Sequence, residues 1–231
     1  MTPLRLSGLL TGAVRPLGDK GVPSGIDKRA VAGPVALAAS GLAGDAQGDL
    51  RVHGGPDKAL HHYPFDHYAP WAEELGALPL LSRCGAFGEN LSTLGLTEAD
   101  AAVGDVFALG SAIIEVSQGR QPCWKLNARF GVADLARCVQ ISGRTGWYYR
   151  VLQAGTVAPE SELRLVDRRA PEWSIRRIWQ IFYRDPLNRD ALAALAELAP
   201  LAEGWRRHAR RRLDTGTVED WSRRLTGDAA G

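Results

Sequence analysis

The chain reads Val106-Phe-Ala-Leu-Gly-Ser-Ala-Ile-Ile-Glu-Val-Ser-Gln-Gly-Arg-Gln-Pro-Cys-Trp-Lys-Leu-Asn127 across the stretch that carries its strongest structural signals. Two apolar runs, 106–109 and 113–117, are joined through Gly110-Ser111, which is typical of a β-hairpin. The second run leads into a loop that holds Cys123 directly after a proline. The stretch therefore predicts a hairpin that delivers a cysteine just beyond the end of a strand.

The first 168 residues around this hairpin share its character. Short runs of Val, Ile, Leu and aromatic residues alternate with Gly and Pro, which favours a barrel or a curled sheet. Two helices are expected to interrupt the strands, one from near Pro64 to Leu75 and one over about 132–141. The predicted strands are 4–10, 35–39, 59–63, 89–92, 106–109, 113–117, 147–152 and 162–166.

The sequence changes character near residues 168–171. Beyond them, prolines at 186 and 200 separate successive helical patterns. Ser174 and Asn188 are suitable N-caps for the first two helices. The fold class is therefore mainly β with α: a β-barrel domain over residues 1–168, followed by a three-helix C-terminal domain over 169–231. The expected helices of the tail are 174–184, 188–198 and 203–213.

The bulk composition limits the kind of protein. The chain has 231 residues, of which 45% are hydrophobic and 23% charged, as in ordinary soluble domains. We expect no membrane partner, because no run approaches the roughly 18 apolar residues that span a bilayer. Three cysteines and no signal-peptide pattern favour a reducing, cytoplasmic setting. The net charge of +2 implies no strong general attraction to nucleic acid.

The three cysteines differ in their local surroundings. Cys123 has Arg120 and Lys125 nearby, and neighbouring cations favour the thiolate, the form that binds soft metals or attacks electrophiles. These local features leave a functional and a structural role equally open. Cys138 falls on the apolar face of a predicted helix and is expected in the core, while Cys84 is interpreted as structural.

Four of the five histidines fall within residues 53–67. The segment Gly54-Gly55-Pro56 predicts a tight turn whose backbone N–H groups approach a ligand closely. His53 before this turn and Lys58 after it are both placed to contact an anion. A zinc site is the rival interpretation, but the histidine spacing matches none of the usual zinc patterns. His62 and His67 are interpreted as surface or packing residues.

Two further segments have weaker signals. In Pro23-Ser-Gly-Ile-Asp-Lys28, Ser24 and Lys28 suit a phosphate site, although a solvated loop has the same composition. In 87–92, the neighbours Glu89 and Asn90 are expected to point to opposite faces of a strand. A buried Asn90 would need hydrogen-bond partners, which the edge of a heterocycle can supply.

Taken together, these segments resemble the MOSC family, most closely its YiiM-like branch, which is associated with resistance to hydroxylaminopurine. The segments occur in the family's order, and the tail resembles the three-helix domain appended in that branch. The resemblance therefore covers nearly the whole chain. The matching segments are 23–28, 52–60, 87–92, 117–127 and 146–151.

The resemblance implies a MOSC β-barrel that binds a molybdenum-pterin cofactor (molybdopterin). It also implies reduction of small N-hydroxylated compounds, including bases such as 6-N-hydroxylaminopurine, with electrons from a separate reductase. Cys123 is implied as the molybdenum ligand and catalytic residue. The residues implied for the cofactor pocket are Ser24, Lys28, His53, Gly54, Gly55, Lys58, Asn90 and Arg120.

Two alternatives stay open. The same thiolate would serve a cofactor carrier or sulfur-transfer protein that holds a persulfide on Cys123. The basic stretch 205–213 places several cations on one helix, which suits phosphates of a nucleic acid. We favour instead a solvated helix face, or an interface for the electron donor or for the second subunit of a homodimer.

Overall fold

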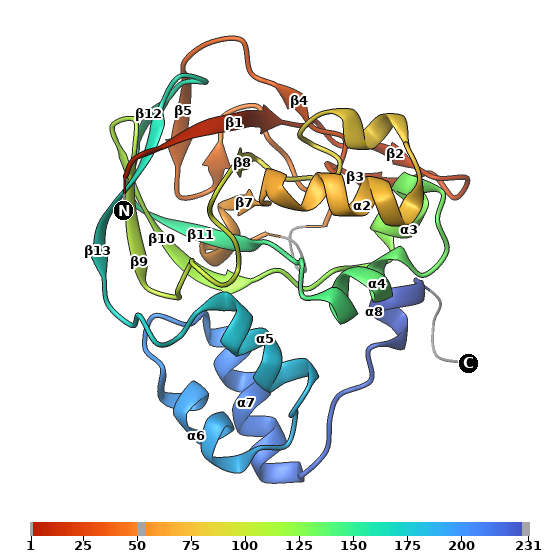
Figure 1. Cartoon of the computed structure of the whole chain (residues 1–231), viewed down its shortest axis with the longest axis vertical. Coiled ribbons are helices and arrows are strands. Elements are labelled where there is room, and N and C mark those ends of the chain that lie inside the picture. Colours follow the sequence, from red (N-terminus) through yellow and green to blue (C-terminus); the bar gives the residue numbers. More distant parts are fainter. Residues whose placement is uncertain (1, 50–53, 228–231) are drawn as a thin grey trace.

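Seven strands close into a barrel in the computed structural model, which describes residues 2–49 and 54–227 (Figure 1). Their order around the barrel is β13-β9-β10-β11-β7-β8-β1, and β1 closes it by pairing with β13. All neighbours are antiparallel except β7 and β8. The strands are β1 (Leu4–Thr11), β7 (Leu60–His62), β8 (Leu91–Thr93), β9 (Asp105–Leu109), β10 (Ala112–Gly119), β11 (Trp147–Gln153) and β13 (Glu162–Arg168).

The predicted hairpin is confirmed as β9 and β10. Ala112 pairs with Leu109 across the turn, and Gly110 adopts a φ of 58°. A Cβ at Gly110 would lie 2.2 Å from the backbone oxygen of Thr156, so this close approach requires glycine. Phe107 and Ile114, which face each other in register, are buried in the barrel core.

Each of the eight predicted strands overlaps an observed one. The remaining strands are two or three residues long, too short to show an alternating pattern. One small sheet combines β12, β5 and β6, another pairs β2 with β3, and β4 pairs with β1. The strands in these smaller pairings, including the predicted strand β5, are β2 (Arg15–Leu17), β3 (Val22–Ser24), β4 (Arg29–Ala30), β5 (Val35–Ala38), β6 (Gly41–Leu42) and β12 (Gly155–Val157).

Both predicted barrel-domain helices are present, and the sequence missed a third. The first starts after Pro64 as the 3-10 turn η2 (Phe65–His67) and continues as α2 (Tyr68–Leu75). The missed helix is α3, which begins two residues after Cys123. The other helical segments of this domain are η1 (Pro56–Lys58), η3 (Pro79–Ser82), α3 (Lys125–Phe130) and α4 (Leu135–Ser142).

The prediction that Cys138 belongs to the core is wrong, because its side chain is exposed. Residues three and four positions apart share a helix face, so position 138 could have joined position 135 on one side, but the buried face of α4 is turned toward positions 136 and 140 instead and leaves 138 outside it. Gln140 is the polar residue on the buried face, where its side chain accepts a hydrogen bond from Arg224. The buried residues of α4 are Leu135, Ala136, Val139 and Gln140.

The C-terminal region contains the three expected helices and a short fourth one. Ser174 caps the first by accepting a hydrogen bond from the backbone N–H of Arg177 at 3.2 Å. Asn188 caps the second by accepting from the N–H of Ala191 at 3.0 Å, so both predicted N-caps are confirmed. The helices are α5 (Ile175–Tyr183), α6 (Arg189–Glu197), α7 (Glu203–Thr215) and α8 (Ser222–Thr226).

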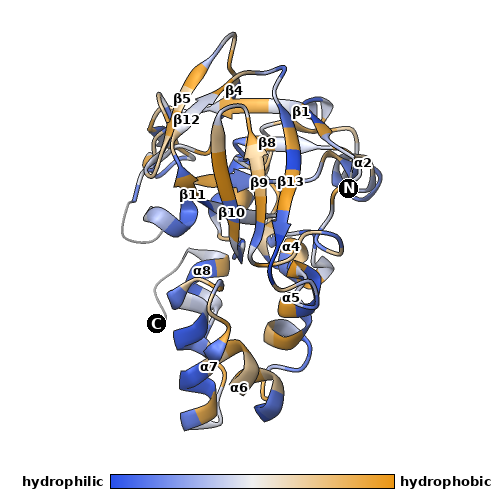
Figure 2. Ribbon diagram, turned by 90° about the vertical axis from the view of Figure 1, so that its left-hand side faces the viewer, coloured by the Kyte–Doolittle hydropathy of each residue, from blue (hydrophilic) through white to orange (hydrophobic). Residues whose placement is uncertain are grey.

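The helical region packs against one end of the barrel strands (Figure 2). A single hydrophobic cluster includes Phe107 and Val116 of the barrel together with Ile175, Phe182 and Trp205 of the helices. The backbone N–H of Ala202 donates to the carbonyl of Ser117 at 2.9 Å. The helical region is therefore attached to the strand that leads to the Cys123 loop.

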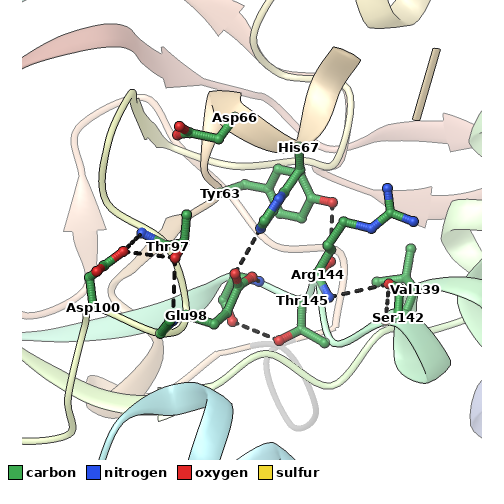
Figure 3. A network of polar contacts seen from close by, with 12 residues as sticks. Tyr63, Asp66, His67, Thr97, Glu98, Asp100, Val139, Ser142, Arg144 and Thr145 are labelled. Atoms are coloured by element: carbon green, nitrogen blue, oxygen red, sulfur yellow. Dashed lines mark hydrogen bonds and ion pairs between the residues drawn. The ribbon is translucent and has the colours of Figure 1, made fainter. Parts of the chain in front are cut away.

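A buried polar network ties η2 to the segment before β11 (Figure 3). His67 Nε2 lies 2.7 Å from Glu98 Oε2, and Glu98 Oε1 accepts from the N–H of Gly146 at 2.7 Å. His62 is also buried, with its two ring nitrogens 3.0 Å from Tyr149 and Thr93. His62 and His67 are thus packing residues rather than surface residues.

Across residues 2–49 and 54–227, the structure contains no helix with the length and apolar character needed to cross a membrane.

Arg212 of α7 is expected to anchor the end of the helical region. Its fully buried guanidinium donates to the Glu219 carboxylate at 2.7 and 2.9 Å and to the carbonyl of Phe182. Breaking a buried ion pair from one side costs roughly 3–5 kcal/mol. Arg212→Met should therefore lower the free energy of unfolding in urea by about 3 kcal/mol, and Arg211→Met, at an exposed neighbour, should not.

The same pair predicts a pH dependence. Burial raises the pKa of Glu219, but the hydrogen bonds from Arg212 outweigh it and bring the value to about 2, below the ordinary 4.5. A lowered pKa stabilises the fold above pH 4.5, and this stabilisation disappears as the pH falls toward 2. The stability gap between wild type and Arg212→Met should narrow over that range. A gap that stays constant down to pH 2 would contradict the assignment.

Candidate functional site

A pocket beside the barrel wall brings together residues from segments far apart in the sequence. Its enclosed volume is about 80 Å³, which holds a group the size of a phosphate and is smaller than the ~300–1,000 Å³ of typical small-molecule pockets. Loops after β3, β6 and β10 contribute, as do η1, β7, β11 and the segment before β8. The lining residues are Ser24, Gly25, Ile26, Lys28, Asp45, Ala46, Gln47, Gly48, Lys58, His61, Phe87, Gly88, Asn90, Arg120, Cys123, Lys125 and Tyr148.

The floor of the pocket is the outer face of β7 and β11. Leu60 and Tyr149 are register partners in the barrel core, and successive side chains of a strand point to opposite faces. Their neighbours His61 and Tyr148 are therefore paired on the outer face, with ring centroids 5.1 Å apart. Burial raises the pKa of Tyr148, so its phenol stays protonated and is able to donate a hydrogen bond.

The loop after β10 supplies the thiol. The backbone N–H of Arg120 donates to the carbonyl of Gly146 at 3.0 Å, which continues the β10–β11 pairing past the end of the strand. Cys123 follows and is half-buried. Helix α3 then begins at Lys125, whose Nζ donates to the carbonyl of Pro23 at 3.0 Å. The thiol is thus carried by a short segment that is fixed at both ends.

A second wall consists of two loops in close contact. A Cβ at Gly25 would lie 1.8 Å from the backbone oxygen of Ala46, so only glycine permits this approach. Asp45 Oδ1 accepts from the N–H of Gly12 at 2.8 Å and forms an ion pair with Lys28. The predicted Ser24–Lys28 segment is therefore a structured pocket wall and not a solvated loop.

The electrostatic character of the pocket is cationic. Lys28, Lys58, Arg120 and Lys125 line it, and Asp45 is the single acidic residue among its described lining residues. Burial lowers the pKa of Lys58, while the charges of Asp57 and of the Cys123 thiolate oppose this shift. Lys58 and Cys123 are thus close enough to interact. Such a site suits an anion next to a thiolate.

His61 is a pocket residue that the sequence interpretation missed. Burial lowers its pKa well below the ordinary 6.5, and the Arg120 charge adds to this effect, so the ring is neutral near pH 7. Its Nε2 is buried and has no hydrogen-bond partner among the described residues. The sequence did contain a signal for His61. It lies between the core positions 60 and 62 of the predicted strand 59–63, so alternation places its side chain on the opposite, outer face.

The interpretation of Glu89 and Asn90 needs correction. Both precede β8 and both are buried, so they do not point to opposite faces of a strand. The Glu89 carboxylate accepts from the N–H groups of Gly85 and Phe87 at 2.6 and 3.1 Å. Asn90 Oδ1 accepts from the N–H of His61 at 3.0 Å, and its Nδ2 donates to a backbone carbonyl at 3.2 Å. Backbone groups of the protein thus provide the hydrogen-bond partners of Asn90 that the sequence analysis assigned to the edge of a heterocycle.

The structure brings together most of the residues proposed from the sequence: Ser24, Lys28, Lys58, Asn90, Arg120 and Cys123 all line the pocket. Gly54 and Gly55 are described, but they are not among the lining residues. His53 lies outside the described residues. The residues that sequence reasoning did not find include Asp45, His61 and Tyr148.

The donor set fits an anionic ligand that also carries a soft metal. Arg120 Nη1 is buried without a hydrogen-bond partner among the described residues, as is His61 Nε2. Buried polar groups are normally paired, so these orphan atoms indicate a polar ligand in the pocket. Cys123 adds a sulfur donor, and thiolates prefer soft metals.

Two families match the chain. The family described as "MOSC domain" matches residues 49–164, and the family described as "YiiM-like, 3-alpha helix domain" matches residues 173–216. Together the two matches cover the barrel strands from β7 onward and the helices α5 to α7.

Individual relatives agree with these matches. Protein YiiM of Escherichia coli strain K12 is 43% identical over 208 residues, which cover 90% of this chain and 92% of that protein. A protein named "Reductase" from Gibberella moniliformis is 34% identical over 178 residues, which cover 77% of this chain but 32% of its own length. The crystal structure of YiiM from Escherichia coli has a TM-score of 0.79 and 39% identity, covering 92% of this chain and 98% of that one.

The Lys28–Asp45 ion pair yields a test of the pocket's charge balance. Burial lowers the pKa of Lys28, whereas the charge and hydrogen bond of Asp45 oppose this effect. Asp45→Asn should therefore lower the Lys28 pKa further, as measured by NMR titration of ¹³C-labelled lysine. Asp27→Asn is the matched control, because Asp27 lies in the same loop and pairs with Arg129. An unchanged or raised Lys28 pKa in Asp45→Asn would refute the assignment.

Proposed function

The chain belongs to the MOSC family, in its YiiM-like branch, and on this basis we propose that it reduces small N-hydroxylated compounds with a molybdenum cofactor. Bases such as 6-N-hydroxylaminopurine are the proposed substrates. The observation that supports the proposal most is the half-buried Cys123 thiol in a pocket of four cations, where Arg120 Nη1 and His61 Nε2 are buried without a partner among the described residues.

The pocket residues fit a molybdenum-pterin cofactor in chemical type. Cys123 would bind the metal as a thiolate, because soft sulfur ligands suit such a centre. Lys28, Lys58 and Arg120 would bind the cofactor phosphate with charge-assisted hydrogen bonds. The pocket, with a volume of about 80 Å³, would hold only part of such a cofactor.

The proposed reaction is balanced as R–NH–OH + 2 e⁻ + 2 H⁺ → R–NH₂ + H₂O. When bound, the cofactor supplies the two-electron chemistry. The chain's own residues would bind the cofactor and the substrate and orient them. The cations neutralise the cofactor's charge, and the protonated Tyr148 is able to donate a hydrogen bond within the pocket. His61 is neutral near pH 7, so it acts there as a hydrogen-bonding group and not as a cation.

The electrons must come from another protein or domain, because the proposed reaction consumes two of them. The relative from Gibberella moniliformis that is named a reductase matches this chain over about a third of its own length. We propose that a separate reductase serves the present chain, and that the basic face of α7 is the contact surface for that reductase or for the second subunit of a homodimer.

The alternative function is a cofactor carrier or sulfur-transfer protein. The same half-buried thiol beside Lys58 and Arg120 would hold a persulfide as readily as a metal. Mass spectrometry of the freshly purified protein distinguishes the two, because a stable added sulfur on Cys123 supports the carrier.

Replacing the thiol is the direct test of metal binding. Cys123→Ser should lose most of its molybdenum after expression in a host that makes the cofactor, because a hydroxyl is a poor ligand for a soft metal. Its reduction of 6-N-hydroxylaminopurine with a working electron donor should fall at least about a hundredfold, as is usual when an essential group is removed. Metal analysis and turnover measure the two effects.

Cys138→Ser is the matched control, because the Cys138 thiol is exposed on α4 and should affect neither quantity. Unchanged metal content in Cys123→Ser would refute the ligand assignment. Cofactor-loaded wild type that leaves hydroxylaminopurine unreduced would refute the activity.

Arg120 provides a separate test of the phosphate-binding role. Arg120→Gln removes a cation whose Nη1 is buried and unpaired among the described residues. Loss of a buried charged partner costs roughly 2–5 kcal/mol, so cofactor retention should fall about thirtyfold or more. Pterin fluorescence after gel filtration measures retention. Arg137→Gln, on the exposed side of α4, should retain the cofactor like wild type. Equal retention by both variants would contradict the role.

A further inference from the structure

The peptide groups on both sides of Cys123 are hydrogen-bonded to one residue about a hundred positions away. Arg224 of α8 donates from Nη1 to the carbonyl oxygen of Pro122, in the peptide group before Cys123. The backbone N–H of Trp124, in the peptide group after Cys123, donates to the carbonyl of Arg224 at 2.8 Å. Arg224 is therefore a two-point clamp on the backbone that carries the thiol.

Further contacts hold the clamp against the barrel domain. Arg224 Nη2 donates to Gln140 Oε1 of α4 at 2.6 Å. Asn127 of α3 donates from Nδ2 to the carbonyl of Leu225 at 3.0 Å. The Arg224 guanidinium thus connects the Cys123 loop to α4, and the next residue connects α8 to the helix that follows the thiol.

The other end of this segment is attached to the helical region. Glu219 receives the bidentate ion pair from Arg212 of α7, and Trp221 packs edge-on against Tyr183 of α5 with centroids 5.1 Å apart. Residues 217–227, which we call the strap, therefore run from the end of α7 past the last residue of α5 to α8, which lies beside α4 (Figure 1) and is hydrogen-bonded to the Cys123 loop. The strap lies beyond residues 173–216, where the three-helix family matches.

Arg224 is not among the residues that line the pocket, whereas it is hydrogen-bonded to the backbone on both sides of Cys123. Its effect on the site must pass through the backbone. A charged donor forms a stronger hydrogen bond than a neutral one, so the Pro122 contact is suited to restrain the loop. Because the Cys123 side chain is half-buried, movement of this loop determines how accessible the thiol is to a reagent in solution.

We propose that Arg224 is a positioning residue that holds the Cys123 thiol in its pocket, and that the strap is the means by which the helical region stabilises the site. The importance of a positioned thiol rests on the proposed function, whereas the restraint of the Cys123 loop does not. This assigns the helical region a role at the site as well as in the shared core.

The restraint is measurable on the cofactor-free protein by the rate at which iodoacetamide alkylates Cys123. Peptide mass spectrometry follows the three cysteines separately, so Cys84 and Cys138 serve as internal references. The Cys123 rate is measured across a pH series to its own upper plateau, where this rate reports access alone, and the rates at Cys84 and Cys138 are compared between variant and wild type at the same pH. The variants are Arg224→Gln, Arg224→Lys and the matched control Arg223→Gln, which removes the same charge from an exposed position of α8.

Arg224→Gln should raise the plateau rate at Cys123 about tenfold, the equivalent of ~1.4 kcal/mol in loop restraint. Rates at Cys84 and Cys138 should stay as in wild type. Arg224→Lys should restore part of the restraint, because a lysine reaches one of the two acceptors but not both. Arg223→Gln should behave like wild type.

Three results would overturn the proposal: a Cys123 plateau within twofold of wild type in Arg224→Gln, the same rise in Arg223→Gln, or an equal rise at Cys84, which indicates general unfolding. Arg224→Lys, the milder change, keeps the test informative if Arg224→Gln folds poorly, since it should still show an intermediate rate.

A second measurement separates this proposal from the proposed function. Cofactor retention in Arg224→Gln is compared with that of Arg223→Gln. Faster alkylation together with faster cofactor loss supports both the clamp and the ligand role of Cys123. Faster alkylation with wild-type retention supports the clamp and counts against Cys123 as the ligand.

Discussion

The pairing of β10 with β11 is the interaction on which the rest of this structure depends. One face of the pair contributes Ile114, Val116 and Tyr149 to the barrel core. The other face supports the pocket, because Tyr148 and Arg120 project from it or just beyond it. Since Ala202 is hydrogen-bonded to the carbonyl of Ser117 in the same strand, β10 also anchors the helical region. Core, pocket and helices therefore share one element.

Four cationic side chains lie around a thiol in the pocket, and burying their charges costs free energy. Burial lowers the pKa values of Lys28 and Lys58, which shows that their charged forms are disfavoured there. Asp45 offsets part of this cost for Lys28 through an ion pair. An anionic ligand would offset the remainder, since it pairs with the same groups. The charge arrangement is thus complementary to an anion, as expected of a binding site for one.

Local signals in the sequence predicted much of the fold. The β9–β10 hairpin, the N-caps Ser174 and Asn188, and each predicted strand depend on residues close together in the chain. The errors arose where distant residues decide. Cys138 is exposed because α4 packs with the face that carries Leu135, Val139 and Gln140, and position 138 lies outside that face. Asn90 accepts a hydrogen bond from the backbone of His61 in β7, and Glu89 accepts one from the Tyr68 hydroxyl of α2, so distant elements fix the buried positions of both side chains.

By itself, the sequence determined the barrel with its helical appendage, because alternation, turn residues and caps act over a few positions, while its resemblance to a family implied the main site residues. Only the tertiary structure decided which of those residues meet. It placed His61 and Tyr148 beneath Cys123 through strand register, and it brought Arg224 to the peptide groups on either side of the thiol. Contacts across a hundred residues depend on packing and leave no local pattern, which is why the strap was not visible in the sequence.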